Sequence, residues 1–198
     1  MAESRDDPEL FFVDPAMRAV FPLESPRFPR RLGRTVRANL FEVRVDSAFE
    51  AILDACAAPG QGERDDTWIN PEIRRLYLAL HAAGFAHSIE SWRDGRLVGG
   101  LYGVALGAAF FGESMVSHET DASKVALVHL VARLRIGGFS LLDAQFMTPH
   151  LRSLGAIEIT RDAYQEQLRP AVRQHADFRR MPYASDGASA WQEITQAS

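Results

Sequence analysis

The segment at residues 123–136 constrains the fold more than any other part of the chain. Drawn as a helix, it has apolar residues on nearly every side, and Gly137-Gly138 follows it as a helix stop. A helix that is apolar all round is stable only when neighbouring elements cover it on every side. We therefore expect this helix to lie deep in the protein.

Strands are predicted on both sides of this helix. Residues 88–92 and 96–104 flank Asp94-Gly95, a dipeptide typical of β-hairpin turns, and residues 108–111 are a third strand. After the helix come a strand at 139–143, a helix at 150–154, a strand at 156–159 and a helix from residue 161. This order predicts an α+β fold with helices on the faces of a sheet, and it is similar to the order of elements in GNAT-type acyltransferases.

The regions around this core have a different character. Residues 1–45 are rich in Pro and Arg and lack a clear period, which predicts extended segments and turns. Helices are predicted after Ser47, which has capping-box spacing to Glu50, and from Asn70-Pro71. We predict a small N-terminal domain over 1–66, packed on a GNAT-like acyltransferase domain over 67–182, and a loosely ordered tail over 183–198.

Composition and missing motifs exclude several classes of protein. The net charge is −4 and Cys56 is the single cysteine, which argues against a generally basic nucleic-acid binder and allows no internal disulfide. The N-terminus lacks a signal-peptide pattern, and the apolar runs are far below the roughly 20 residues of a membrane span. The histidines lack metal-ligand spacing, and no P-loop or Rossmann fingerprint occurs. We expect a cytoplasmic protein without metal, cofactor or membrane contact.

Arginines gather in the N-terminal part of the chain. Six lie within eighteen residues, with Glu42 the only acid among them: Arg27, Arg30, Arg31, Arg34, Arg37 and Arg44. Such a cluster can hold phosphates even on an acidic protein. It also fits a solvated face in a chain whose single lysine is Lys124. Both interpretations stay open from the charge pattern alone.

Three polar residues stand at the ends of predicted strands, among glycine and apolar residues. Asp143 and Gln145 follow Leu141-Leu142, and their spacing places both on one side of an extended strand. Glu113 comes directly after Phe110-Phe111-Gly112. A carboxylate can orient an amine, and an amide can both donate and accept hydrogen bonds, so these groups suit aminolysis of an ester or thioester. The alternative is that they only satisfy backbone groups of loops or cap a helix.

Several further motifs occur in a fixed order along the chain. They are Thr67-Trp68-Ile69, His87-Ser88-Ile89-Glu90, Gly99-Gly100-Leu101-Tyr102-Gly103-Val104, Gly112-Glu113-Ser114-Met115, Ala122-Ser123-Lys124 and Asp143-Ala144-Gln145, followed by matches from Thr148 to Tyr164. With these motifs the sequence resembles the bacterial leucyl/phenylalanyl-tRNA–protein transferases over about residues 8–165.

The resemblance implies a two-part architecture and a reaction. The leucyl or phenylalanyl group of an aminoacyl-tRNA would be transferred to the N-terminal Arg or Lys of a protein, which marks that protein for degradation by the N-degron pathway. An apolar pocket discriminates weakly between similar side chains, so methionyl-tRNA is a further expected donor. The implied partners are aminoacyl-tRNA and proteins or peptides with a basic N-terminal residue, and we expect a monomer.

The resemblance also implies roles for individual residues. Asp143 and Gln145 match the catalytic pair, in which Gln145 contacts the attacking amine and the ester while Asp143 polarises or orients it. Glu113 would help to hold the basic N-terminus, and Trp68 would stack near the terminal adenosine. The positions that line the pocket for the aminoacyl side chain are Leu101, Phe110, Leu130 and Leu142. The charge pattern, and not the motif match, supplies the expected tRNA-binding residues Arg27, Arg30, Arg31, Arg34 and Arg37.

The chain departs from the family pattern in three places. Phe11-Phe12 stands where Trp-Trp or Phe-Trp is usual, and Val116-Ser117-His118 stands where Phe-Ser-Arg is usual. Met1 stands where an upstream helical stretch would end, so we expect a misassigned start or a short form that lacks an adenosine-stacking aromatic residue. Two alternatives stay open: a non-catalytic or weakened tRNA- or peptide-binding descendant, and a CoA-dependent N-acetyltransferase. The second fits poorly, because Leu101 replaces the last glycine of a pyrophosphate loop.

Overall fold

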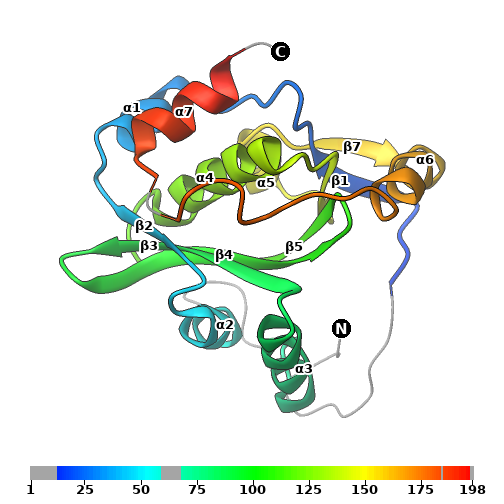
Figure 1. Cartoon of the computed structure of the whole chain (residues 1–198), viewed down its shortest axis with the longest axis horizontal. Coiled ribbons are helices and arrows are strands. Elements are labelled where there is room, and N and C mark those ends of the chain that lie inside the picture. The colour runs from blue at the N-terminus through cyan, green and yellow to red at the C-terminus, as the bar shows by residue number, and fades with distance from the viewer. Residues whose placement is uncertain (1–12, 59–67, 184, 197–198) are drawn as a thin grey trace.

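A single mixed sheet has helices on both of its faces (Figure 1). The computed structural model describes residues 13–58, 68–183 and 185–196. Within these residues seven strands pair in the order β2-β3-β4-β5-β6-β1-β7, all antiparallel except β5 with β6. They are β1 (Met17–Phe21), β2 (Glu42–Val45), β3 (Ala86–Arg93), β4 (Arg96–Leu106), β5 (Ala109–Ser117), β6 (Leu141–Gln145) and β7 (Ile157–Thr160). The α+β class predicted from the sequence is confirmed.

The central region follows the sequence pattern, although β6 lies two residues later than predicted and β5 is much longer. Helix α4 (Ala122–Gly137) is buried without interruption from Val125 to Leu134, because the sheet covers one side of it and other helices cover the rest. Strand β5 continues well past its predicted end at residue 111. The extra length is possible because Glu113 is accommodated as a β-bulge between the Gly103↔Gly112 and Tyr102↔Ser114 pairs.

Two strands and a helix form in the segment where the sequence predicts only extended segments and turns. Strand β1 lies between β6 and β7, and β2 forms the opposite edge beside β3. Helix α1 (Arg30–Arg37) buries Leu32 and Val36, which are too few apolar residues to give a clear helical period. Both strands belong to the same sheet as β3–β7. A domain boundary at residue 66 stays a prediction, because residues 59–67 lie outside the described part.

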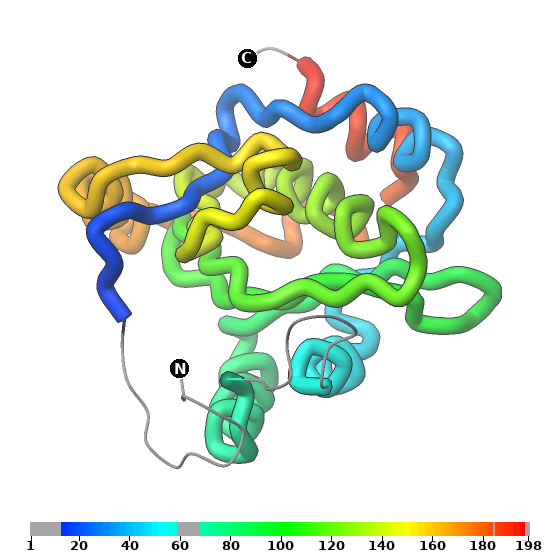
Figure 2. Tube along the Cα trace, turned by 180° about the vertical axis from the view of Figure 1, so that it is seen from behind, coloured from blue at the N-terminus to red at the C-terminus, as the bar shows by residue number. Residues whose placement is uncertain are grey.

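The other helices divide between the two faces of the sheet (Figure 1, Figure 2). Helices α1, α4 and α7 (Gly187–Thr195) pack together on one face, with α5 (Pro149–Ser153) nearby. Helices α2 (Phe49–Ala57) and α3 (Pro71–Ala82) cover the opposite face, and α6 (Arg161–Ala171) packs on β1, β6 and β7. No helix in these described ranges combines the length and the apolarity that a bilayer span requires.

Helix α7 differs from the loosely ordered tail that the sequence predicts. Ala190 and Ile194 are buried against the core, and α7 packs on α1 and α4. A Cβ placed on Gly187 would lie 1.9 Å from the carbonyl oxygen of Val36, so glycine is required for the close approach of these helices. Small residues suggest a mobile tail in the sequence, whereas here they permit tight packing.

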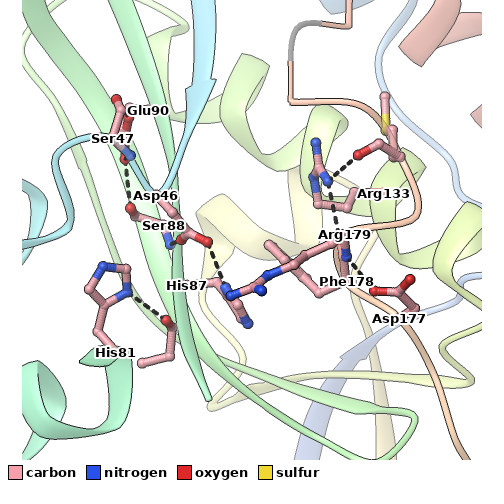
Figure 3. Close-up of polar contacts among 12 residues, drawn as sticks. Asp46, Ser47, His81, His87, Ser88, Glu90, Arg133, Asp177, Phe178 and Arg179 are labelled. Atoms are coloured by element: carbon pink, nitrogen blue, oxygen red, sulfur yellow. Dashed lines mark hydrogen bonds and ion pairs between the residues drawn. The ribbon is translucent and has the colours of Figure 1, made fainter. Parts of the chain in front are cut away.

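A buried carboxylate replaces the capping box predicted at the start of α2 (Figure 3). The backbone N–H groups of Ser47 and Ala48 each donate to Oε1 of Glu90 at 3.0 Å, and the Ser47 hydroxyl donates to Oε2. Ser47 therefore satisfies Glu90 instead of capping the helix itself, and Ala48 is the residue at the cap position. Glu90 therefore connects the start of α2 to β3, the strand next to the edge strand β2.

Candidate active site

The three polar residues singled out in the sequence meet where β5 and β6 part. The parallel pairing of these strands ends at Phe111↔Asp143. Beyond that point Glu113 occupies the bulge of β5 and Gln145 occupies the last position of β6. The structure thus brings Glu113, Asp143 and Gln145 into one hydrogen-bonded group, while their roles stay predictions.

Asp143 is fully buried, and both of its carboxylate oxygens have partners. The guanidinium of Arg18 forms an ion pair with Oδ2, and the hydroxyl of Tyr164 donates to the same oxygen at 2.8 Å. Burial lowers the pKa of Arg18, but the hydrogen bond and the charge of Asp143 outweigh it and raise that pKa overall. The backbone N–H of Gln145 donates to Oδ1 at 2.8 Å. Asp143 is therefore an anchored group rather than an exposed proton acceptor.

Gln145 has an unusual backbone conformation. Its φ is 62°, in the left-handed region that residues other than glycine rarely adopt, and the bond to Asp143 stabilises this turn. The Nε2 group of Gln145 donates to Oε2 of Glu113 at 3.2 Å. Burial raises the pKa of Glu113, although hydrogen bonds from Tyr77 and Gln145 oppose the shift.

An aromatic row extends from Glu113 towards Trp68. The ring of Tyr77 meets Trp68 edge-on with centroids 6.3 Å apart, and it meets Tyr102 in the same way at 5.2 Å. Tyr77 also hydrogen-bonds Glu113. Burial raises the pKa of both tyrosines, and the Tyr102 hydroxyl has no hydrogen-bond partner among the described residues. The half-buried Trp68 is therefore connected to Glu113 through Tyr77.

Sequence reasoning missed four residues of this site: Arg18, Tyr77, Tyr102 and Tyr164. Tyr77 has the spacing of an apolar helix face, and Arg18 lies in a segment without a period. Tyr102 and Tyr164 occur within the matching motifs but carry no chemical signal by themselves. Only the folded sheet brings Arg18 and Tyr164 next to Asp143.

The four residues expected to line the aminoacyl pocket lie together in the core. Leu101, Phe110, Leu130 and Leu142 are exposed by 4%, 0%, 1% and 2% and belong to one cluster on the α4 side of the sheet. Asp143, one residue beyond Leu142, contacts α6 on the other side. The partly buried Met115 and Ala144 extend the cluster to the place where β5 and β6 part.

The expected tRNA-binding arginines are exposed in and around α1. Leu32, Gly33 and Val36 face the core, which leaves the other side of the helix basic. None of the five makes an ion pair with another residue in the described part of the chain: Arg27, Arg30, Arg31, Arg34 and Arg37. A surface cavity of about 530 Å³ lies between Arg31 and the segment that precedes α4. Within the described ranges no group of three or more His, Cys, Asp or Glu residues could hold a metal ion.

Comparison with known proteins gives consistent matches along the chain. The family model of the leucyl/phenylalanyl-tRNA protein transferases matches residues 20–169. Proteins named leucyl/phenylalanyl-tRNA–protein transferase from Nitrobacter winogradskyi and Phenylobacterium zucineum are each 58% identical to the whole chain, which covers 88% and 91% of their lengths. One from Maricaulis maris is 54% identical over the whole chain and 91% of its own length.

A solved structure resembles the chain only distantly. It is the crystal structure of a functionally unknown conserved protein from Staphylococcus epidermidis, with a TM-score of 0.43 and 10% identity. The match covers 73% of this chain and 57% of that one. At this score the likeness identifies neither fold nor function.

Proposed function

We propose that this chain, which belongs to the leucyl/phenylalanyl-tRNA protein transferase family, transfers Leu, Phe or Met from aminoacyl-tRNA to the N-terminal Arg or Lys of proteins. The family is one of aminoacyltransferases. The observation that carries the proposal is the linked group Glu113–Gln145–Asp143 at the parting of β5 and β6. In this group Glu113 is an acid for a cationic substrate, and Gln145 is an amide for the reacting groups. Asp143 holds Gln145 in place.

The reaction forms one C–N bond and breaks one C–O bond. The α-amine of the acceptor attacks the ester carbon of the aminoacyl-tRNA, loses a proton, and the ribose oxygen leaves as a hydroxyl. Aminolysis of an ester is downhill, so alignment and stabilisation of the carbonyl oxygen are the main tasks. Gln145 suits them because its amide can donate to the carbonyl oxygen and accept from the amine.

The surroundings of Gln145 support the proposed substrates. The apolar cluster of Leu101, Phe110, Leu130 and Leu142 would take the aminoacyl side chain beside the place where β5 and β6 part. Trp68 would stack on the terminal adenosine. The product would enter the N-degron pathway, and we place the reaction in the cytoplasm, where aminoacyl-tRNA is found, with a monomeric enzyme of GNAT-like architecture.

The direct test of this function is a transfer assay with purified protein. Labelled leucine on tRNA is offered together with a peptide that begins with Arg and, separately, one that begins with Glu. We expect label in the first peptide only. Absence of transfer to any peptide would favour the non-catalytic alternative, and acetylation of the peptide by acetyl-CoA would favour the N-acetyltransferase.

We expect the exposed face of α1 to contribute tRNA affinity. Reversing two charges in Arg30→Glu/Arg34→Glu should raise KM for leucyl-tRNA about tenfold or more. The dependence of log KM on log salt concentration should also become weaker, because each lost phosphate contact lowers the slope of that plot by nearly one unit. The KM for the peptide and the kcat should change little. The matched control is Arg75→Glu/Arg152→Glu, exposed arginines that pair with Glu72 and Glu158. Equal KM values for both double variants would refute the assignment of α1.

The pKa of Glu113 predicts the pH dependence of peptide binding. Burial raises this pKa, and a carboxyl group loses its charge as the pH falls through its pKa. KM for an Arg-peptide should therefore rise on the acid side, at a higher pH than an exposed glutamate would cause. In Glu113→Gln the KM for the Arg-peptide should be high at every pH and should not rise further in acid. The exposed control Glu72→Gln should show the same rise of KM in acid as the wild type. If KM in Glu113→Gln rose in acid just as it does in the wild type, Glu113 would be excluded as the group whose protonation causes that rise.

A further inference from the structure

Two side chains from distant elements hold the carboxylate of Asp143. Arg18 of β1 donates to Oδ2, and the hydroxyl of Tyr164 in α6 donates to the same oxygen at 2.8 Å. The guanidinium carbon of Arg18 also lies 4.6 Å from the centre of the Tyr164 ring. The three residues form one buried cluster, which we call the Arg18–Tyr164–Asp143 cluster.

The charge of Arg18 is poorly explained by stability alone. Its side chain is only 12% exposed, and its Nε is buried without a hydrogen-bond partner among the described residues. An unpartnered buried donor costs free energy, and replacing a buried ion pair by apolar residues of similar volume is often neutral or stabilising. A cluster that served packing only would not need this cation. Its presence points to a task at Asp143.

That task follows from the second oxygen of Asp143. While Oδ2 is held by Arg18 and Tyr164, Oδ1 accepts the backbone N–H of Gln145 at 2.8 Å. This bond stabilises the left-handed conformation of Gln145, whose carboxamide then reaches Glu113 at 3.2 Å. The orientation of the Asp143 carboxylate thus determines where the Gln145 carboxamide lies.

We propose that Arg18, assisted by Tyr164, is a positioning residue: it fixes Asp143 so that Gln145 presents its carboxamide beside Glu113. The kinetic consequence of this role rests on the proposed transferase function. The structural consequence is a fixed backbone conformation at Gln145, and it does not depend on the transferase function.

Kinetic measurements test the first consequence. Arg18→Met keeps much of the side-chain volume but removes the cation, and we expect kcat to fall about 30- to 100-fold with a much smaller change in KM for the Arg-peptide. Arg18→Lys, which retains the charge with a less suitable geometry, should recover part of this loss. Tyr164→Phe removes one hydroxyl from an otherwise intact ring and should lower kcat about three- to tenfold. Arg152→Met, at an exposed ion pair with Glu158, should leave kcat unchanged.

A double-mutant cycle separates positioning from a general structural effect. If Arg18 acts through Asp143, adding Arg18→Met to Asp143→Asn should lower kcat by less than about threefold further, since the single variant has already lost the group that Arg18 holds. If the double variant instead lost kcat by the product of the two single-variant factors, Arg18 would act independently of Asp143, and the proposal would be overturned.

Amide hydrogen exchange tests the structural consequence in the same proteins without any substrate. In Arg18→Met the amide of Gln145 should exchange about tenfold faster or more, while the amide of Leu142 in the same strand stays protected. Arg152→Met should leave both amides unchanged. Unchanged exchange at Gln145 in Arg18→Met would overturn the proposal even if the wild-type protein transfers leucine. Conversely, a wild-type protein that transfers nothing contradicts the transferase function, while the exchange at Gln145 still decides the role of Arg18.

Discussion

Asp143→Ala is expected both to slow transfer strongly and to destabilise the fold. We expect kcat to fall about 100- to 1000-fold, a loss typical of removing one stabilising group from an active site. We also expect the free energy of unfolding to decrease by about 3–5 kcal/mol, because Arg18 is left as a buried cation without its partner. The sequence alone suggests a loss of activity with little effect on folding. The ion pair with Arg18 changes that expectation.

Urea denaturation and single-turnover transfer measure the two effects separately. Asp143→Asn keeps the shape of the side chain and should retain more stability than Asp143→Ala while losing most of the activity. Asp54→Ala removes an exposed carboxylate that pairs with Arg74, so it should cost less than about 1 kcal/mol. An Asp143→Ala protein that is as stable and as active as the wild type would contradict both roles of Asp143.

Arg133→Met is expected to cause the largest loss of stability outside the site. The guanidinium of Arg133, fully buried in α4, donates to the carbonyl oxygens of Phe178, Met181 and Pro182 at 2.7–2.9 Å. Figure 3 shows Arg133 beside Phe178. Burial lowers the pKa of this guanidinium, and three carbonyl groups partly compensate for the burial. Removing it leaves the carbonyl groups of Phe178 and Met181 without their donor, while that of Pro182 keeps the Ser185 hydroxyl at 2.9 Å. The loss should cost about 3–5 kcal/mol in total.

The consequences of Arg133→Met reach the apolar cluster. The ring of Phe178 stacks on Phe110 with centroids 5.7 Å apart, so release of the segment after α6 should loosen the proposed aminoacyl pocket. We expect faster amide exchange over residues 178–183 together with the loss of stability in urea. Arg75→Met, at an exposed ion pair, is the matched control and should change the stability by less than about 1 kcal/mol. A similarly small change in Arg133→Met would refute this structural role.

Local pattern was sufficient to predict the central elements. The apolar helix and the hairpin around Asp94-Gly95 have a local signal of their own. The short apolar run at 139–143 predicted a strand that forms two residues later, as β6. The sequence groups Glu113 with Asp143 and Gln145 because each stands at the end of a predicted strand, although β5 in fact continues past Glu113 through a bulge and the contact between Glu113 and Gln145 is seen only in the structure. Local sequence patterns were therefore sufficient to identify these three residues of the site but not the contacts among them.

Contacts between distant segments could not be predicted in the same way. Arg18 precedes Asp143 by 125 residues, and its strand β1 enters the sheet between β6 and β7, an arrangement that no local pattern indicates. Helix α7 forms because Gly187 and Ala190 fit closely against α1 and α4, which depends on a partner that the local sequence does not contain. Tertiary packing decides both cases.

The central claim is that Glu113, Gln145 and Asp143 form the site at which a basic N-terminus accepts an aminoacyl group. The most direct measurement is the single-turnover transfer of leucine from leucyl-tRNA to two peptides that differ only in an N-terminal Arg or Glu, with wild-type protein and Glu113→Gln. We expect the wild type to label only the Arg-peptide, and Glu113→Gln to lose most of that transfer through weaker binding of the peptide. Equal labelling of both peptides by the wild type, or an unchanged rate in Glu113→Gln, would contradict the claim.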